Sequence, residues 1–362
     1  MTELWMHGCG PNPEEGARHL KELGFKAVVG SAGGAEAVLS QGMDYYICSG
    51  AYRGPDFKGD EWLAEDPWGG KHEWFSSTCP SRKEVRSYNL EQVRRIAAVP
   101  GIKGVLIDGA RFASPSSGKT TDALFTCFCP HCMEKAKRKG FDVKEMQMAV
   151  ATLHDFVHGK KLDLMPFYFG IQEWLNFRRA ATTEHLLDFV QAVKEVNPEL
   201  KAGIYIFAPA LSDLVGQNYR DLQGKMDIIA PMLYRCYKDP NGPACLNVEL
   251  ADMLRMLEGA ADLTEEQRIR MVGGFVGHEL TGYEKPEDMQ AGLSVRILKR
   301  ETERARIMCP KEQLVPIIQL DDPLLDEAID QTMAGGAEAV NFFVYDEKIV
   351  EHQRAVWEKL RQ

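Results

Sequence analysis

The sequence has no long apolar run and no excess of positive charge. None of its 362 residues belongs to an uninterrupted apolar stretch approaching the ~18 residues of a transmembrane helix. Its 53 Asp and Glu outnumber its 43 Lys and Arg, which gives a net charge of −10 and argues against a nucleic-acid partner. The first residues form neither the basic nor the apolar part of a signal peptide. We therefore expect a cytoplasmic protein that binds neither membranes nor nucleic acids.

Two further features are missing. The nine cysteines are an odd number, which does not suit a disulfide scaffold. The segment Ser116–Thr121 ends like a phosphate-binding loop, but Ala113 stands where that motif needs its first glycine. We expect no nucleotide there and no other organic cofactor. With 44% hydrophobic and 27% charged residues, the composition is that of an ordinary folded protein.

Short apolar runs alternate with amphipathic helical stretches along the whole chain. Nine runs are bounded by Gly, Pro or Asp and predict buried parallel strands. They are Leu4–His7, Lys26–Gly30, Asp44–Ser49, Gly104–Asp108, Ala202–Phe207, Asp227–Leu233, Met271–Val276, Leu314–Leu320 and Ala339–Tyr345. This alternation predicts one α/β domain over residues 1–362, a (β/α)8 TIM barrel rather than a doubly wound sheet. Nine runs compete for eight places, and Met271–Val276 is the weakest of them.

Two connections are long and both leave the carboxyl ends of strands, where barrel active sites lie. Residues 53–88 follow the third strand and residues 113–182 follow the fourth. The first connection holds three of the six tryptophans, which are Trp62, Trp68 and Trp74. Their rings either stack on a sugar as substrate-binding residues or anchor the loop to the barrel rim. The sequence leaves both interpretations open.

Three cysteines are packed into six residues of the second connection. Cys127, Cys129 and Cys132 are soft metal ligands, and zinc takes four ligands in a tetrahedron. Cys79, at the end of the first connection, is the best candidate for the fourth ligand, and His131 is its rival. Four protein ligands leave no open position, so we expect a structural Zn²⁺ that joins the two long connections.

Acidic residues follow the predicted strands at the carboxyl rim. A glycosidase needs such acids, one carboxylate as nucleophile or base and one carboxylic acid. Asp108 is the expected nucleophile or base, Asp321 is the first choice for the acid, and Glu279 is its rival. Arg111 is close enough in sequence to keep the Asp108 carboxylate ionised. The other rim residues expected to bind substrate hydroxyls or tune the carboxylates are Tyr234, Arg235 and Gln319.

Other acids and histidines favour simpler roles. Asp322 and Asp346 also follow strands, and we expect them to cap the next helices. His154 and His158 are four residues apart with Asp155 beside the first, a pattern similar to a metalloprotease motif but with Asp in place of Glu. We expect a partly exposed helix face there rather than a catalytic zinc.

The chain resembles glycoside hydrolase family 42, the zinc-containing β-galactosidases. The resemblance rests on Cys79-Pro80-Ser81, the strand to Asp108 and the cluster Cys127–Cys132, with a gap of 48 residues from Cys79 to Cys127. The segments Trp174–Arg178 and Gly335–Phe343 are similar to barrel glycosidases more widely. The resemblance implies a barrel, a structural zinc bound by the four cysteines, and hydrolysis of a glycosidic bond in a short saccharide or glycoside.

The sequence departs from that family at its catalytic positions. Family 42 has an Asn-Glu pair at the end of strand four, where this chain has Asp108-Gly109. No glutamate ends Leu314–Leu320 to match the family nucleophile. We therefore expect a distant relative with its own catalytic pair. A non-catalytic sugar-binding barrel and a lyase or isomerase on the same scaffold stay open, as does assembly into a homo-oligomer.

Overall fold

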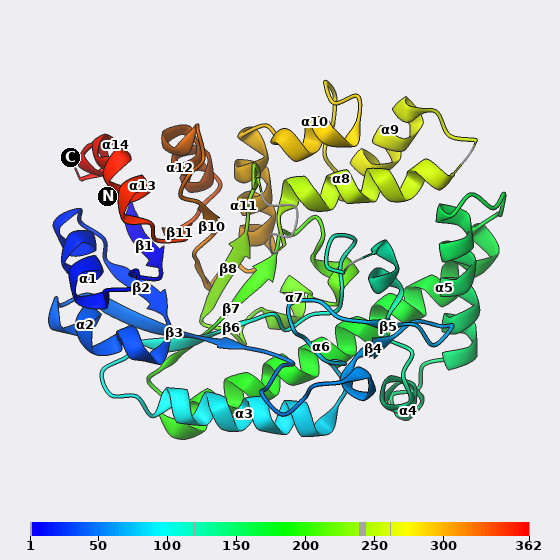
Figure 1. The fold of residues 1–362 in the computed structure, drawn as a ribbon, viewed down its shortest axis with the longest axis horizontal. Coiled ribbons are helices and arrows are strands. Elements are labelled where there is room, and N and C mark those ends of the chain that lie inside the picture. The colour runs from blue at the N-terminus through cyan, green and yellow to red at the C-terminus, as the bar shows by residue number, and fades with distance from the viewer. Residues whose placement is uncertain (1, 119, 239–243, 261, 362) are drawn as a thin grey trace.

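The computed structural model describes residues 2–118, 120–238, 244–260 and 262–361. Its main sheet closes on itself, because the strand order is β10-β11-β1-β2-β3-β6-β7-β8-β9 and β10 also pairs with β8 (Figure 1). The strands are β1 (Glu3–His7), β2 (Ala27–Gly30), β3 (Asp44–Gly50), β6 (Gly104–Asp108), β7 (Lys201–Phe207), β8 (Ile228–Met232), β9 (Gln313–Leu314), β10 (Ile317–Gln319) and β11 (Ala339–Phe343). β9 and β10 are the two halves of the seventh barrel strand. The predicted (β/α)8 barrel is therefore confirmed.

The seventh strand is split at Pro316. Proline has no N–H to donate to a neighbouring strand, so the ladder is interrupted there. Its carbonyl still accepts from the Asn341 N–H at 2.9 Å, and Leu314 and Ile317 on either side pair with β8. The interruption therefore leaves the barrel closed.

Helices surround the barrel, and their apolar faces pack on strand residues that are almost completely buried. These helices are α1 (Pro13–Glu22), α2 (Ala35–Ser40), α3 (Lys83–Ala97), α6 (Tyr168–Val196), α7 (Tyr219–Leu222), α8 (Leu246–Met256), α11 (Arg296–Met308), α12 (Leu325–Ala334), α13 (Glu347–His352) and α14 (Arg354–Leu360). Both ends of the chain lie at the left of Figure 1. Of the helices in the described ranges, none is long and apolar enough to cross a membrane.

The run Met271–Val276 is a helix, so its prediction as a strand was wrong. It forms the second half of α9 (Glu265–Val276), which begins with a capping box between Thr264 and Gln267 and ends at Gly277 with φ +64°. Val272 and Val276 are buried whereas Met271 and Phe275 are exposed, which is the period of a helix. The other eight predicted runs supply the eight barrel strands.

The two long connections pack together beside the barrel, towards the right of Figure 1. The first contains the antiparallel ribbon of β4 (Ala64–Glu65) and β5 (Lys71–His72). The second contains the 3-10 turn η3 (Thr121–Phe125), α4 (Pro130–Arg138) and α5 (Val143–Val157), and its last residues form the first half of the long helix α6. They share a second apolar core whose largest side chains are Trp74, Phe112, Phe125, Trp174 and Phe177.

Candidate active site at the barrel mouth

Asp108 lies at the carboxyl end of β6, on the rim of the barrel. It ends β6 and is partly buried, and within the described part of the chain no hydrogen bond reaches its side chain. The negative charge of Asp108 affects the pKa of five nearby groups, which are His7, Cys48, Arg111, Tyr205 and Tyr234. We call Asp108 and these five residues the barrel mouth. A carboxylate surrounded by polar groups of several strands is the arrangement from which barrel enzymes build active sites.

Burial and the Asp108 charge act together on the neighbouring groups. Burial raises the pKa of Tyr205 and Tyr234 well above the usual range, and the Asp108 carboxylate adds to both increases. Burial lowers the pKa of His7, and Asp108 offsets part of that change. At neutral pH the two phenols therefore keep their protons and His7 is mainly a neutral imidazole.

A chain of hydrogen bonds fixes the His7 ring. Asn341 Nδ2 donates to the Tyr205 hydroxyl at 3.0 Å, and that hydroxyl lies 3.0 Å from His7 Nδ1. Because an amide nitrogen only donates, the Tyr205 oxygen accepts from it, and the same hydroxyl either donates to or accepts from His7 Nδ1. Sequence reasoning missed all three residues, because each reads as an ordinary strand position.

Arg111 is a buried cation beside Asp108. Its Nη1 donates to the Phe112 carbonyl at 3.1 Å and to Ser117 Oγ at 2.7 Å. The guanidinium also lies over the rings of Phe75 and Phe207, 5.1 and 4.7 Å from their centroids. Burial lowers the pKa of Arg111 to about 10, against the charges of Glu249 and Asp108. The side chain therefore remains positive at neutral pH.

A small cavity of about 60 Å³ opens beside Asp108. Its lining residues are Ala51, Arg53, Phe75, Ser77, Asp108, Gly109, Arg111, Met232 and Ala244. The volume suffices for a few water molecules. Phe75 is the aromatic residue of the first connection that reaches this cavity, and the tryptophan-based prediction overlooked it.

The three predicted tryptophans lie elsewhere. Trp74 is buried in the second apolar core, and Trp62 packs against Phe57 and under the Arg82 guanidinium. Trp68 is 52% exposed and its ring centroid is 4.3 Å from that of His154. Each of the three rings thus contacts other side chains of the protein, and their binding of substrate stays a prediction.

Arg235 and Gln319 are engaged within the protein. Arg235 donates to both carboxylate oxygens of Asp322 and, at 2.6 Å, to the Leu293 carbonyl. Gln319 Oε1 accepts from the Cys236 N–H at 2.9 Å. These bonds tie the loop after β8 to the loop after β10.

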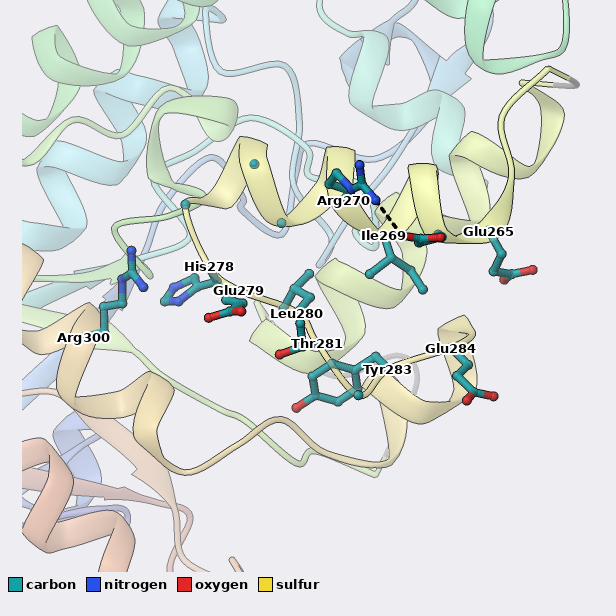
Figure 2. A pocket seen from close by; sticks show the side chains of 15 residues that line it. Glu265, Ile269, Arg270, His278, Glu279, Leu280, Thr281, Tyr283, Glu284 and Arg300 are labelled. Atoms are coloured by element: carbon teal, nitrogen blue, oxygen red, sulfur yellow. Dashed lines mark hydrogen bonds and ion pairs between the residues drawn. The ribbon is translucent and has the colours of Figure 1, made fainter.

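The two acid candidates line cavities other than the one beside Asp108. Asp321 is exposed and shares a cavity with Lys348 and His352. Glu279 is exposed in a cavity of about 910 Å³ between α9 and the segment that leads to α10 (Pro286–Ala291), and Figure 2 shows it among the lining side chains. Asp346 caps α13, as expected, by accepting from the N–H groups of Lys348 and Ile349.

Cys79, Cys127, Cys129 and Cys132 come together as one buried group, which we call the thiol cluster. Cys79 Sγ lies 3.3, 3.4 and 3.7 Å from the sulfurs of Cys129, Cys132 and Cys127, and all four cysteines are free. Four sulfurs placed ~2.3 Å from a central zinc are about 3.8 Å apart. The thiol cluster therefore has the donor set and nearly the spacing of a tetrahedral metal site.

Groups around the thiol cluster suit negatively charged sulfurs. The N–H groups of Ser81 and Glu65 each donate to a sulfur at 3.4 Å. Burial lowers the pKa of the fully buried Arg178 of α6 to about 9, and negative charge on Cys127 and Cys132 opposes this change. His131, the rival ligand, lies outside the cluster in a surface cavity beside Ser81.

Known proteins share this fold but little of the sequence. No family model matches the chain and no curated protein sequence is similar to it. A β-galactosidase from the psychrophilic Marinomonas ef1 superposes with a TM-score of 0.64 at 10% identity, over 99% of this chain and 59% of that one. A family 42 β-galactosidase from G. stearothermophilus gives 0.57 at 11% identity, over 98% and 56%.

A shorter protein matches over its whole length. The PgaB (BpsB) glycoside hydrolase domain from Bordetella bronchiseptica has a TM-score of 0.57 at 14% identity and covers 100% of this chain and 98% of that one. The chain thus spans less than three fifths of the two β-galactosidases but nearly all of this domain. The fold is distantly similar to that of family 42 and other glycoside hydrolases.

Proposed function

We propose that the protein is a glycoside hydrolase that acts on a short saccharide or glycoside, with Asp108 as nucleophile or base. The observation that carries the proposal is the position of Asp108, which ends β6 of the closed barrel and lines a cavity together with Arg111 and Phe75. The glycoside hydrolases of the same fold support it.

The neighbours of Asp108 have separate tasks in this proposal. Arg111 holds positive charge beside the Asp108 carboxylate, which acts as nucleophile or base in its ionised form. Tyr234 presents a protonated hydroxyl to the sugar. His7, whose Nδ1 is hydrogen-bonded to the Tyr205 hydroxyl, offers its Nε2 to the sugar. Phe75 offers an aromatic face at the edge of the cavity.

A second carboxylic acid is needed to protonate the leaving oxygen. Asp321 remains our first choice because it follows β10 on the same rim, and Glu279 remains its rival. The anomeric configuration of the product shows whether hydrolysis retains or inverts the configuration of the substrate. Retention requires carboxyl groups ~5–5.5 Å apart, and inversion ~6.5–9.5 Å.

We also propose that the thiol cluster holds one Zn²⁺ per chain. Cys79, Cys127, Cys129 and Cys132 would be its four ligands, and the ion would supply cross-linking of the two long connections and no chemistry at Asp108.

The test is Asp108→Asn, which keeps the shape and removes the charge. We expect unchanged folding and at least ~10²-fold slower release of an aryl glycoside, since that is the lower end of an acid or base role. Asp56→Asn, at an exposed aspartate of the first long connection, is the matched control. More than half of the wild-type kcat/KM in Asp108→Asn overturns the assignment. A wild-type protein that binds saccharides but hydrolyses none favours the non-catalytic sugar-binding barrel.

A further inference from the structure

A second group of metal-ligating side chains lies apart from both the thiol cluster and the barrel mouth. His154 and His158 are one turn apart on α5, and Asp122 of η3 faces them. Asp122 Oδ1 is 3.3 Å from His154 Nε2 and 3.6 Å from His158 Nε2. Ligand atoms ~2.0–2.2 Å from a tetrahedral zinc are about 3.3–3.6 Å apart. The three side chains therefore have the spacing that one ion imposes.

Protonated imidazoles would pair with Asp122 here, and a metal ion can take the place of those protons. Asp122 Oδ1 is buried, yet among the described residues it has no hydrogen-bond partner. His158 Nδ1 lies 2.9 Å from the His154 carbonyl, which can only accept, so the hydrogen of a neutral ring is on Nδ1. Its Nε2 then directs a lone pair at the Asp122 carboxylate. The neutral His158 ring and the Asp122 carboxylate therefore offer two lone pairs between which a metal ion can bind.

The neighbouring rings hold the two imidazoles in place. The rings of His154 and His158 are stacked at 4.0 Å and 27°. Trp68 and Phe125 contact the His154 ring at centroid distances of 4.3 and 5.1 Å. The two imidazoles are therefore held close to Asp122 before any ion binds, and binding turns the stacked rings towards a common point.

We propose that Asp122, His154 and His158 bind one exchangeable divalent transition-metal ion, such as Zn²⁺ or Co²⁺. Two imidazoles and one carboxylate suit these ions better than Ca²⁺ or Mg²⁺. The side chain of His158 is 47% exposed, so the fourth position faces solvent and takes water. The ion braces η3 against α5. This site is independent of the proposed hydrolase activity and of the thiol cluster.

The experiment titrates the full chain with Co²⁺ after exchangeable ions have been removed with EDTA. We expect one bound equivalent whose visible spectrum lacks the thiolate charge-transfer bands that cobalt in the thiol cluster would show. Zn²⁺ should displace it and, by binding the folded state, raise the Tm. Asp122→Asn and His158→Ala should each weaken binding at least ~10-fold, because each removes a ligand. His352→Ala, at an exposed histidine of α13, is the matched control and should bind as the wild type does.

Two results would overturn the proposal. One is a wild-type protein that binds no cobalt outside the thiol cluster in a large excess of Co²⁺. The other is unchanged affinity in Asp122→Asn and His158→Ala. Circular dichroism of the variants checks that they remain folded, which is expected because the three side chains lie partly at the surface.

Discussion

Arg235 and Asp322 form a buried, two-point ion pair at the rim of the barrel. Arg235 Nε donates to Oδ2 at 2.7 Å and Nη2 donates to Oδ1, while their side chains are only 7% and 2% exposed. Nη1 is bound to the Leu293 carbonyl. Each nitrogen of the guanidinium thus has a partner within the protein, which favours a stabilising role over contact with substrate.

Removing one partner of this pair should destabilise the fold. Arg235→Met leaves the Asp322 carboxylate buried without its cation, so we expect a loss of about 3–5 kcal/mol in the free energy of unfolding. The double variant Arg235→Met/Asp322→Leu should recover much of it. Urea unfolding measures the free energy of unfolding of both variants. The control is Arg354→Met, which breaks the exposed Arg354–Glu351 pair and should change the free energy of unfolding by less than ~1 kcal/mol. Wild-type stability with a raised KM would instead support substrate binding by Arg235.

The thiol cluster should hold one equivalent of zinc. Cys132→Ser removes one of the four thiolates and should lower both the metal content and the unfolding free energy, because metal binding contributes to folding. Elemental analysis and thermal unfolding measure these effects. Cys309→Ser, at a buried cysteine far from the cluster in sequence, should keep the metal. Less than a tenth of an equivalent of any metal in the wild type would contradict the prediction.

The barrel and the thiol cluster could be predicted because their signals are local. Apolar runs punctuated by Gly, Pro and Asp identify strands, and three cysteines in six residues restrict the chemistry. Met271–Val276 misled because a short apolar run fits a strand as well as a helix. The exposure of Met271 and Phe275 shows that its period is helical.

The polar network of the mouth could not be predicted in the same way. His7, Tyr205 and Asn341 are separated by 198 and 136 residues and meet only because the barrel closes. Nothing local marks them as partners. Likewise, nothing local in the sequence shows that Arg235 pairs with Asp322, which is 87 residues away.

Phe75 rather than a tryptophan should contribute to substrate affinity. It lines the cavity beside Asp108, whereas Trp68 packs on His154. Phe75→Ala should raise KM several-fold with little change in kcat, because a stacking contact is equal in the ground and transition states. Trp68→Ala is the matched control on the same connection. A larger increase in KM for Trp68→Ala than for Phe75→Ala would instead support substrate binding by the tryptophans.

Stability should fall in acid partly through His185. This fully buried ring of α6 accepts from Arg86 Nε at 3.3 Å, and burial together with Arg86 and Lys135 lowers its pKa to about 3. The unfolded chain has an ordinary histidine with a pKa of about 6.5. Below that pH the unfolded state binds a proton that the folded state does not, so stability decreases as the pH falls from about 6.5 towards 3.

This pH dependence should disappear in part when the imidazole is replaced. Between pH 7 and 4.5, His185 accounts for a loss of about 2–3 kcal/mol. His185→Gln keeps a neutral side chain that can accept a hydrogen bond from Arg86 but cannot take up a proton. Between pH 7 and 4.5, the unfolding free energy of this variant should therefore fall by about 2–3 kcal/mol less than that of the wild type. Urea unfolding at several pH values measures the difference. His352→Gln, at an exposed site, should follow the wild type. Parallel curves for His185→Gln and the wild type would mean that His185 is protonated without cost in the fold, and the loss in acid would then have to come from other groups.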